Sequence, residues 1–295
     1  MKYPSDVELC EVGPRDGFQF ESKIIPTEVK VEWIQRLVKS GLPRIQIASF
    51  VHRIRVPQMA DAEAVIQQLG SSSRTLFSGL ALNVKGVERA ADAGLSAVDL
   101  SIATNEKHGS DNAGMSVDQG VLQAEQMIAL ATARGMSVQL NVQTVWGYKV
   151  PGDTPLTRVL DLAKRFSNVG LESFSLADST GMANPLSIQR VVEAVKTVTD
   201  VPLVLHLHDT RGLGIANIVA ALESGVNRFD TSLGGLGGCP FIPGATGNVA
   251  TEDVVYLLDS LGIRTGIKNE NVAGVSRDVS DFLGRNLSGK MYSLV

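Results

Sequence analysis

Eight short runs of β-type residues alternate with helix-type segments along most of this 295-residue chain. Each run is dominated by apolar and β-branched residues, and together they occupy residues 7–12, 44–50, 76–82, 97–103, 137–145, 173–179, 201–209 and 228–236. Strands that alternate with helices pack as parallel units, and eight such units in about 250 residues are typical of a closed barrel. The pattern therefore predicts an α/β fold, a (β/α)8 TIM barrel.

The segments between the runs have the spacing of amphipathic helices. In residues 27–41 apolar side chains recur on one stripe, and Gly41 then supplies a stop signal. In residues 184–200 the same periodicity follows Pro185, which is typical of a helix start. Thr251 precedes two acids and is expected to cap another helix.

A doubly wound open sheet is the structural alternative to a barrel. That fold would be favoured by a G-x-G-x-x-G loop after the first strand, but residues 11–20 read EVGPRDGFQF and lack this spacing. No β-type run follows residue 264. We therefore expect one catalytic domain over residues 1–295, with a barrel over about 6–264 and a short helical C-terminal extension over about 265–295.

The composition is that of an ordinary globular protein. Apolar residues make up 44% and charged residues 20% of the chain, and the net charge is −4, with Lys and Arg scattered. These features give no sign of a nucleic-acid or membrane surface. The start lacks the pattern of a signal peptide, and two distant cysteines make no disulfide framework. We expect a cytoplasmic protein.

Several polar residues fall where the predicted strands end. The active site of a parallel barrel is built at the C-terminal ends of its strands. The residues at these ends are Arg15 and Asp16 after the first strand, Ser49 after the second, Thr104 after the fourth, Asp178 at the sixth, and His206 and His208 at the seventh.

The stretch HLHD at residues 206–209 carries the strongest chemical signal. Because side chains alternate along a strand, His206 and His208 should point the same way. Two imidazoles with the carboxylate of Asp16, and an amide oxygen from Asn248, would suit a divalent cation such as Mg²⁺ or Mn²⁺. The alternative is a pair of hydrogen-bonded histidines in a polar barrel mouth, but acids at two other strand ends favour the metal.

The glycine-rich stretch at residues 234–248 follows the last strand. Its glycines either permit a tight turn or let the backbone approach a ligand. Cys239 lies among them and is equally consistent with proton transfer and with a small buried side chain. Arg15 is consistent with a plain ion pair to Asp16 and with stabilisation of a developing enolate oxygen.

Four stretches resemble the 3-hydroxy-3-methylglutaryl-CoA lyase family of DRE-TIM metallolyases. They are EVGPRDGFQFE, SFVHRIRVPQMAD, LHLHDTRGLGIAN and GGLGGCPFIPGATGNVATEDVVYLLDSLGI, within a similarity from about residue 6 to 266. The resemblance implies a metal-dependent barrel, usually a homodimer, that acts on an acyl-CoA. It also implies retro-Claisen cleavage of 3-hydroxy-3-methylglutaryl-CoA, or a close relative, to acetyl-CoA and a keto acid such as acetoacetate, as in leucine degradation.

The resemblance also implies roles for individual residues. The metal ligands would be Asp16, His206, His208 and Asn248, and His206 would have a second role in proton transfer. Arg15 would polarise the thioester carbonyl. Cys239 would lie on a glycine loop that closes over the substrate, and Asp178 would be a polar residue near the site. The expected substrate contacts are Arg15, Gln19, Gln46, Ser49, Thr104, Gly237 and Gly238.

Two positions depart from the family pattern. Gln46 stands where the family has a glutamate, and residues 142–152 read VQTVWGYKVPG in place of a cysteine-containing GCPYEG. A neutral amide cannot exchange a proton or add negative charge near a metal. These departures leave two alternatives open: a related aldolase or Claisen-type synthase that uses a different keto acid, and a barrel that binds metal and acyl-CoA with little lyase activity.

Overall fold

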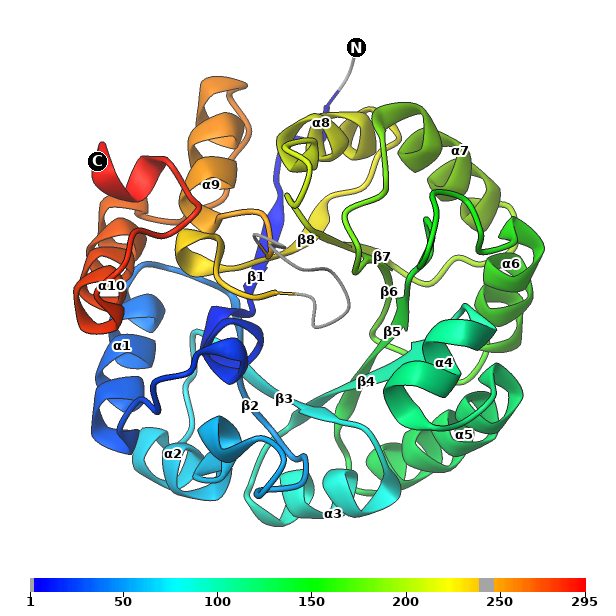
Figure 1. Cartoon of the computed structure of the whole chain (residues 1–295), viewed down its shortest axis with the longest axis horizontal. Helices are drawn as coiled ribbons and strands as arrows, with labels where there is room; N and C mark the ends of the chain where they lie inside the picture. The colour runs from blue at the N-terminus through cyan, green and yellow to red at the C-terminus, as the bar shows by residue number, and fades with distance from the viewer. Residues whose placement is uncertain (1–2, 239–246) are drawn as a thin grey trace.

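The computed structural model describes residues 3–238 and 247–295. In this part of the chain eight parallel strands close into one barrel, in the order in which they occur in the sequence (Figure 1). The strands are β1 (Glu8–Glu11), β2 (Arg44–Ser49), β3 (Leu76–Ala81), β4 (Ala97–Ala103), β5 (Ser137–Gln143), β6 (Ser173–Asp178), β7 (Leu203–Leu207) and β8 (Arg228–Thr231). Each lies inside one of the predicted runs, and the predicted TIM barrel is confirmed.

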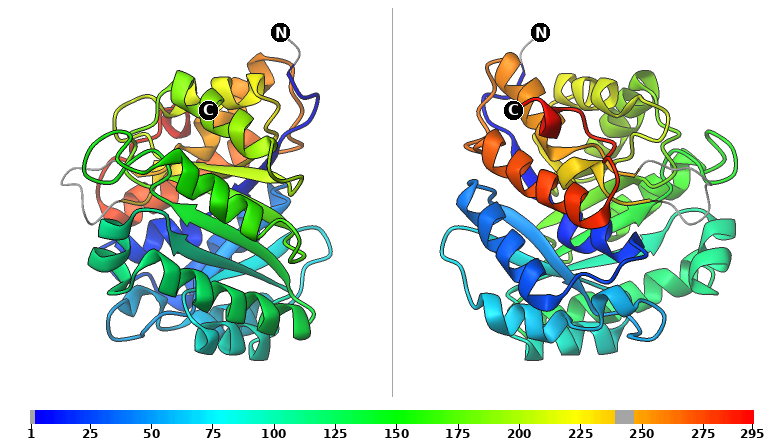
Figure 2. Two further views of the ribbon diagram at one scale, coloured as in Figure 1. Left: turned by 90° about the vertical axis from the view of Figure 1, so that its right-hand side faces the viewer. Right: turned by 60° about the vertical axis from the view of Figure 1, so that its left-hand side comes forward.

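Helices surround the barrel on its outside (Figures 1 and 2). They are α1 (Thr27–Lys39), α2 (Ala62–Leu69), α3 (Val84–Asp92), α4 (Glu106–Ala113), α5 (Val117–Ala133), α6 (Leu156–Arg165), α7 (Pro185–Lys196), α8 (Gly214–Glu223), α9 (Thr251–Ser260) and α10 (Asn269–Leu283). Helix α10 packs against α1 and α9, beside the seam where β1 pairs with β8. Among the helices of the described residues, none has both the length and the apolar character needed to cross a membrane.

The helix ends follow the signals in the sequence. Helix α7 begins at Pro185, and Asn184 before it forms a capping box with Ser187. After α1 the chain turns at Gly41, whose φ is +97°. A side chain there would place its Cβ 2.5 Å from the carbonyl oxygen of Gly266, so this turn requires glycine.

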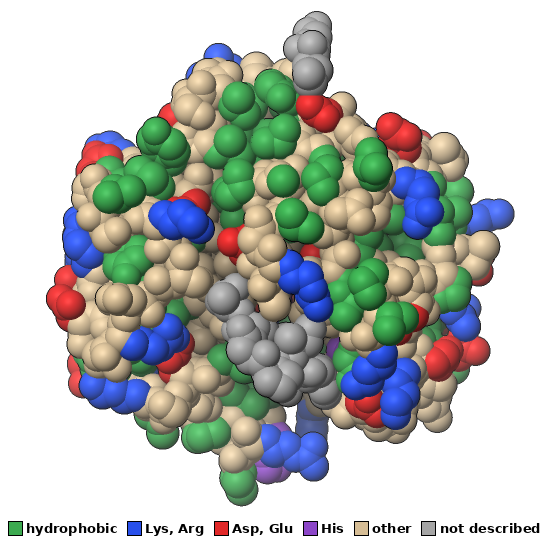
Figure 3. Space-filling model, turned by 45° about the horizontal axis from the view of Figure 1, so that its top comes forward, with side chains coloured by type: hydrophobic (Ala, Val, Ile, Leu, Met, Phe, Trp, Pro, Cys, Tyr) green, Lys and Arg blue, Asp and Glu red, His purple; other side chains and the backbone are tan. Residues whose placement is uncertain are grey.

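The hydrophobic core lies between the barrel and its helices, because the strands alternate in character. In β4, Val98, Leu100 and Ile102 are buried in this core, whereas Asp99 and Ser101 line the cavity inside the barrel. β5 repeats this alternation. On the face shown in Figure 3, cationic and anionic side chains are interspersed over the outer surface. Because β4 and β5 direct polar side chains inward and apolar side chains outward, the interior of the barrel is a polar chamber enclosed by an apolar layer.

Glu11 at the end of β1 joins three segments from opposite ends of the chain. Its Oε1 accepts hydrogen bonds from the backbone N–H groups of Gly13, at 2.7 Å, and Leu233, at 2.8 Å. Its Oε2 accepts a bond of 2.6 Å from the hydroxyl of Thr251. The prediction that Thr251 caps α9 is wrong, because Thr251 is the first residue of that helix and its hydroxyl is directed to Glu11.

We expect Glu11 to make stability depend on pH. Burial raises the pKa of its carboxyl from 4.5 to about 8, against the opposing effect of its hydrogen bonds. The folded protein thus holds a proton that the unfolded chain has released, so this stabilisation is complete below pH 4.5 and is lost as the pH rises to about 8. Glu11→Gln should reduce the fall in unfolding free energy between pH 5.5 and 8.5 by roughly 1 to 3 kcal/mol, measured by urea unfolding.

Glu270→Gln, the same substitution at an exposed glutamate, should leave the pH dependence of the unfolding free energy as it is in the parent. Equal slopes for the parent and Glu11→Gln would show that Glu11 does not titrate in this range.

Candidate active site

A short π-helical turn, η1 (Gly13–Gly17), follows β1 and carries Arg15 and Asp16 into the barrel mouth. The turn is buried and tightly packed. A Cβ at Gly13 would lie 2.6 Å from Glu11 Oε1, and one at Gly17 would lie 2.7 Å from the Cβ of Leu236. The glycines therefore allow the turn to pack closely enough to present its two charged side chains.

His206 lies in β7, and His208 follows it at the end of the strand. Their Nε2 atoms are 3.3 Å apart, and both rings are buried. The backbone of His208 forms a β-bridge with Asn248, which lies beyond β8. The prediction that the two imidazoles share one side of the strand is confirmed.

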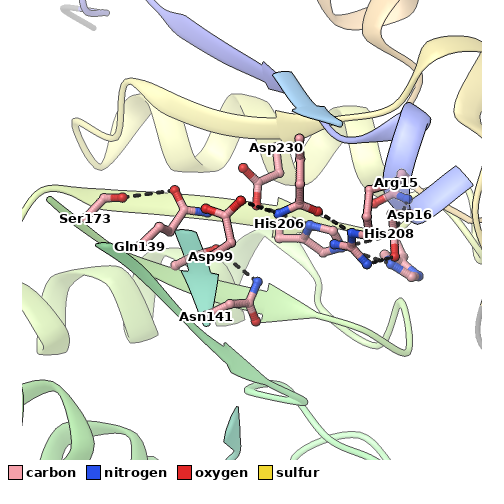
Figure 4. Close-up of polar contacts among 12 residues, drawn as sticks. Arg15, Asp16, Asp99, Gln139, Asn141, Ser173, His206, His208 and Asp230 are labelled. Carbon is pink, nitrogen blue, oxygen red and sulfur yellow. Dashed lines mark hydrogen bonds and ion pairs between the residues drawn. The ribbon is translucent and has the colours of Figure 1, made fainter. Parts of the chain in front are cut away.

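Asp16 meets these histidines across the barrel mouth (Figure 4). Its Oδ2 is 3.9 Å from His206 Nε2, and one donor atom from each of Asp16, His206 and His208 lies within 4.8 Å of the other two. Asn248 donates from Nδ2 to Asp16 Oδ2 at 2.8 Å, while its Oδ1 is buried and has no hydrogen-bond partner within residues 3–238 and 247–295. Two imidazoles, a carboxylate and an unpartnered amide oxygen fit a divalent cation.

The protonation states also suit metal binding. Burial opposes ionisation of Asp16, but the positive charge of Arg15 and the hydrogen bond from Asn248 favour it, and the pKa of Asp16 is lowered. Burial lowers the pKa of His208 to about 3, which keeps the ring neutral and its lone pair free. His206 Nδ1 lies 3.3 Å from Oδ2 of Asp230 on β8. A proton on Nδ1 would bond to this carboxylate and leave Nε2 with its lone pair toward Asp16.

Arg15 is held from two sides and keeps one nitrogen available. Its Nη1 donates to Asp16 Oδ1 at 2.5 Å, and its Nε donates to Gln46 Oε1. Gln19 also donates to Asp16 Oδ1, at 3.3 Å. Nη2 of Arg15 has no hydrogen-bond partner among the described residues. The guanidinium is therefore fixed in place, with one N–H edge free to meet an oxygen of a bound molecule.

A cavity of about 530 Å³ opens beside this cluster. Its wall includes Arg15, Asp16 and both histidines. Figure 4 shows His206 between the Asp16 side of the site and a second polar group around Asp99 and Gln139. The polar part of the wall that comes from β2, β4 and β5 consists of Gln46, Asp99, Ser101, Gln139, Asn141 and Gln143.

Most of that polar wall was not anticipated from the sequence, although it left a signal. In β5, which reads SVQLNVQ at residues 137–143, every second residue is polar, and in β4 Asp99 and Ser101 alternate with apolar residues. Alternation of this kind places one set of side chains inside the barrel. Asp230 is the other residue that sequence reasoning missed, and its place in the short stretch RFDT gave only the same weak signal.

The predicted substrate contacts divide into two groups. Gln19, Gln46 and Gly238 line the cavity. Ser49 and Thr104 are buried outside its wall, and the hydroxyl of Thr104 donates to the carbonyl oxygen of Gln143.

The remaining predicted residues lie around the metal-ligand cluster. Gly237 passes so close to it that a Cβ would lie 2.5 Å from Asn248 Nδ2. Asp178 is outside the cavity wall, and its oxygens accept the N–H groups of Met182 and Ala183. Burial raises the pKa of Asp178 to about 6 despite these bonds. Cys239 lies outside the described residues.

Comparison with known proteins agrees with this geometry. The model of a family described as HMGL-like matches residues 6–279. The chain belongs to the HMGL-like family.

Relatives in this family include a hydroxymethylglutaryl-CoA lyase of Bacillus subtilis, 35% identical over 98% of this chain and 97% of the relative. A mitochondrial hydroxymethylglutaryl-CoA lyase of Gallus gallus is 36% identical over the same shares of the two chains.

Solved structures in the HMGL-like family share the whole fold. The HMG-CoA lyase of Bacillus subtilis superposes with a TM-score of 0.95 at 35% identity, covering 100% of this chain and 99% of the other. An HMG-CoA lyase of Acinetobacter baumannii, solved in complex with coenzyme A and 3-methylmalate, gives a TM-score of 0.93 at 34% identity, with 99% and 96% covered.

We expect Mn²⁺ to bind at the cluster of Asp16, His206 and His208. Asp16→Ala or His208→Ala should abolish measurable binding in isothermal titration calorimetry. Asp230→Asn should weaken it by about 10- to 100-fold, because it removes only the group that orients His206. Asp209→Asn is the matched control, since its carboxylate bonds to the N–H of Gly214 at 2.7 Å and lies outside the cluster. Equal loss of affinity in the control would place the ion elsewhere.

Proposed function

We propose that this protein is a carbon–carbon lyase that cleaves 3-hydroxy-3-methylglutaryl-CoA, or a closely related 3-hydroxyacyl-CoA, to acetyl-CoA and a keto acid such as acetoacetate. The observation that carries the proposal is the convergence of Asp16, His206 and His208 beside the fixed guanidinium of Arg15, in a chain of the HMGL-like family. We propose Mg²⁺ or Mn²⁺ as the cation, because oxygen and imidazole ligands suit these ions.

The reaction requires charge to be moved and then neutralised. The hydroxyl on C3 loses its proton, and the C2–C3 bond breaks as C3 becomes the ketone of the keto acid. The electron pair of that bond passes to C2 and onto the thioester oxygen as an enolate, and C2 then takes a proton to give acetyl-CoA. A divalent cation held by Asp16, His206, His208 and Asn248 would supply Lewis acidity that lowers the pKa of the hydroxyl.

Residues of the chain would act at two places in this reaction: at the thioester oxygen, where negative charge forms, and at the groups that lose or gain a proton. Arg15 directs its free Nη2 edge toward the thioester oxygen and stabilises the negative charge that forms there. We assign His206 a second role in proton transfer through Nδ1, which lies 3.3 Å from Asp230 Oδ2, because the lone pair of Nε2 would be taken by the cation. The proposal also assigns Cys239 to proton transfer at the closing glycine loop.

Other features of the proposal follow from the relatives. The Acinetobacter baumannii structure contains coenzyme A, which supports an acyl-CoA substrate here. The relatives are lyases, and this does not favour a synthase that runs the condensation. We further propose a homodimer in the cytoplasm, with one catalytic domain whose barrel spans about residues 6–264.

The direct test is acetyl-CoA release from 3-hydroxy-3-methylglutaryl-CoA by the purified protein with Mn²⁺, followed in a coupled assay. We expect turnover that is lost with a chelator and restored by Mn²⁺. A panel of related 3-hydroxyacyl-CoA thioesters should be assayed in parallel. No acetyl-CoA from any of them would reject the proposed function.

Arg15→Gln should separate catalysis from metal binding. Arg15 is not a metal ligand in this arrangement, so Mn²⁺ affinity should change by no more than a few-fold. The rate constant kcat should fall by about 10²-fold or more, as expected when one preorganised charge is removed. His206→Ala and Asp16→Ala should instead abolish metal-dependent turnover. An equal loss of Mn²⁺ affinity in Arg15→Gln and Asp16→Ala would contradict this division of roles.

A further inference from the structure

Gln46 lies between two charged groups, and both of its ends are hydrogen-bonded. Its Oε1 accepts from Nε of Arg15, and its Nε2 donates to Oδ2 of Asp99 at 2.5 Å. A flipped amide would place N–H against N–H on one side and oxygen against a carboxylate on the other, so its orientation is fixed. The pairing of β2 with β3 shifts register between Gln46 and Ala48, an irregularity of the kind that re-aims side chains at active sites.

Asp99 belongs to a hydrogen-bonded chain of polar side chains that starts at the half-buried Glu172. Its Oδ1 accepts from Nη2 of Arg44 at 2.6 Å, and Arg44 Nη1 donates to Glu172 at 2.6 Å. Ser78 also donates to Asp99 Oδ2, at 2.6 Å. Asp99 is 2% exposed and Arg44 3%, so water screens these charges little. The chain leads from Glu172 through Arg44, Asp99 and Gln46 to Arg15.

The geometry assigns Asp99 as a positioning residue for Arg15, acting through the amide of Gln46. This assignment rests on the proposed function, in which Arg15 stabilises the enolate. The Asp99 carboxylate polarises the Gln46 amide by accepting its N–H, and the amide oxygen then binds the guanidinium more strongly. With Nε and Nη1 both held, Arg15 presents its remaining edge in one orientation.

The same geometry explains why the neutral residue at position 46 is compatible with catalysis. The family pattern has its negative charge on the second strand. Here the negative charge is that of Asp99 on β4, which is separated from Arg15 by the amide of Gln46. A glutamate beside Asp99 would bring two carboxylates within 2.5 Å, with no proton donor between them. Gln46→Glu alone should therefore reduce activity rather than increase it.

Exchanging the amide at position 46 and the carboxylate at position 99 should restore the hydrogen bonds that hold Arg15. In the double variant Gln46→Glu/Asp99→Asn, the new amide on β4 can donate to the new carboxylate on β2 and accept from Arg44 with its oxygen. The new carboxylate accepts from Arg15 Nε. Each link from Glu172 to Arg15 then has a donor and an acceptor, and one negative charge remains. Ser78, which donates to Asp99 Oδ2 in the parent, can accept the second N–H of the new amide.

The test is a double-mutant cycle on the full-length protein with Mn²⁺. We expect each of Gln46→Glu and Asp99→Asn to lower kcat by about tenfold or more, with KM and Mn²⁺ affinity within about threefold of the parent. The double variant should recover kcat to within about threefold of the parent. As a matched control, Asp161→Asn removes one acid from the exposed face of α6 and should leave kcat unchanged.

The outcomes are distinguishable. Suppose that the parent is active, and that the losses of kcat caused by the two substitutions multiply in the double variant or that Gln46→Glu raises kcat. Either result rejects the positioning role and leaves the proposed function standing. A double variant that recovers the melting temperature but not kcat, or that folds no better than the worse single variant, also rejects it. A parent that releases no acetyl-CoA rejects the proposed function itself, and the positioning role with it.

Discussion

The site depends on one contact, between the turn that follows the first strand and the end of the seventh. Asp16 and His206 are 190 positions apart in the numbering of the chain, yet Asp16 Oδ2 lies 3.9 Å from His206 Nε2. Only closure of the barrel brings them together, because β1 pairs with β8 and β8 pairs with β7. The positions of Arg15, Asn248 and the cavity wall relative to one another all follow from this closure.

Two buried acids, Glu11 and Glu252, hold the backbone around that contact by hydrogen bonds. Glu11 ties the turn carrying Asp16 to the segment after β8, and Glu252 accepts the N–H of Gly234 and the hydroxyl of Ser276. Burial raises the pKa of Glu252 to about 7. Both acids are buried, and each accepts a backbone N–H group from Leu233 or Gly234, which follow β8.

Polar residues inside a barrel are costly unless each finds a partner. Here Arg44, Asp99 and Gln46 are hydrogen-bond partners for one another inside the barrel, and the same network holds a charged group at the mouth. Stability and catalysis thus draw on the same bonds. Gln46 is neutral where the family has a glutamate. Because it is hydrogen-bonded to the Asp99 carboxylate as well as to Arg15, the negative charge of Asp99 still acts on Arg15 through the amide.

The alternation of strand and helix patterns was sufficient to predict the fold, because hydrophobic periodicity reports local geometry directly. The same local rule placed His206 and His208 on one side of their strand. The chemistry of a divalent cation then suggested Asp16 and Asn248 as their partners, and the family resemblance implied the same four residues. The sequence could not reveal that Asp99 bonds to Gln46 or that Asp230 orients His206, because those contacts join strands distant in the chain and depend on register. Nor could it exclude Ser49 and Thr104 from the cavity wall, since their side-chain directions are decided by packing where the strands end.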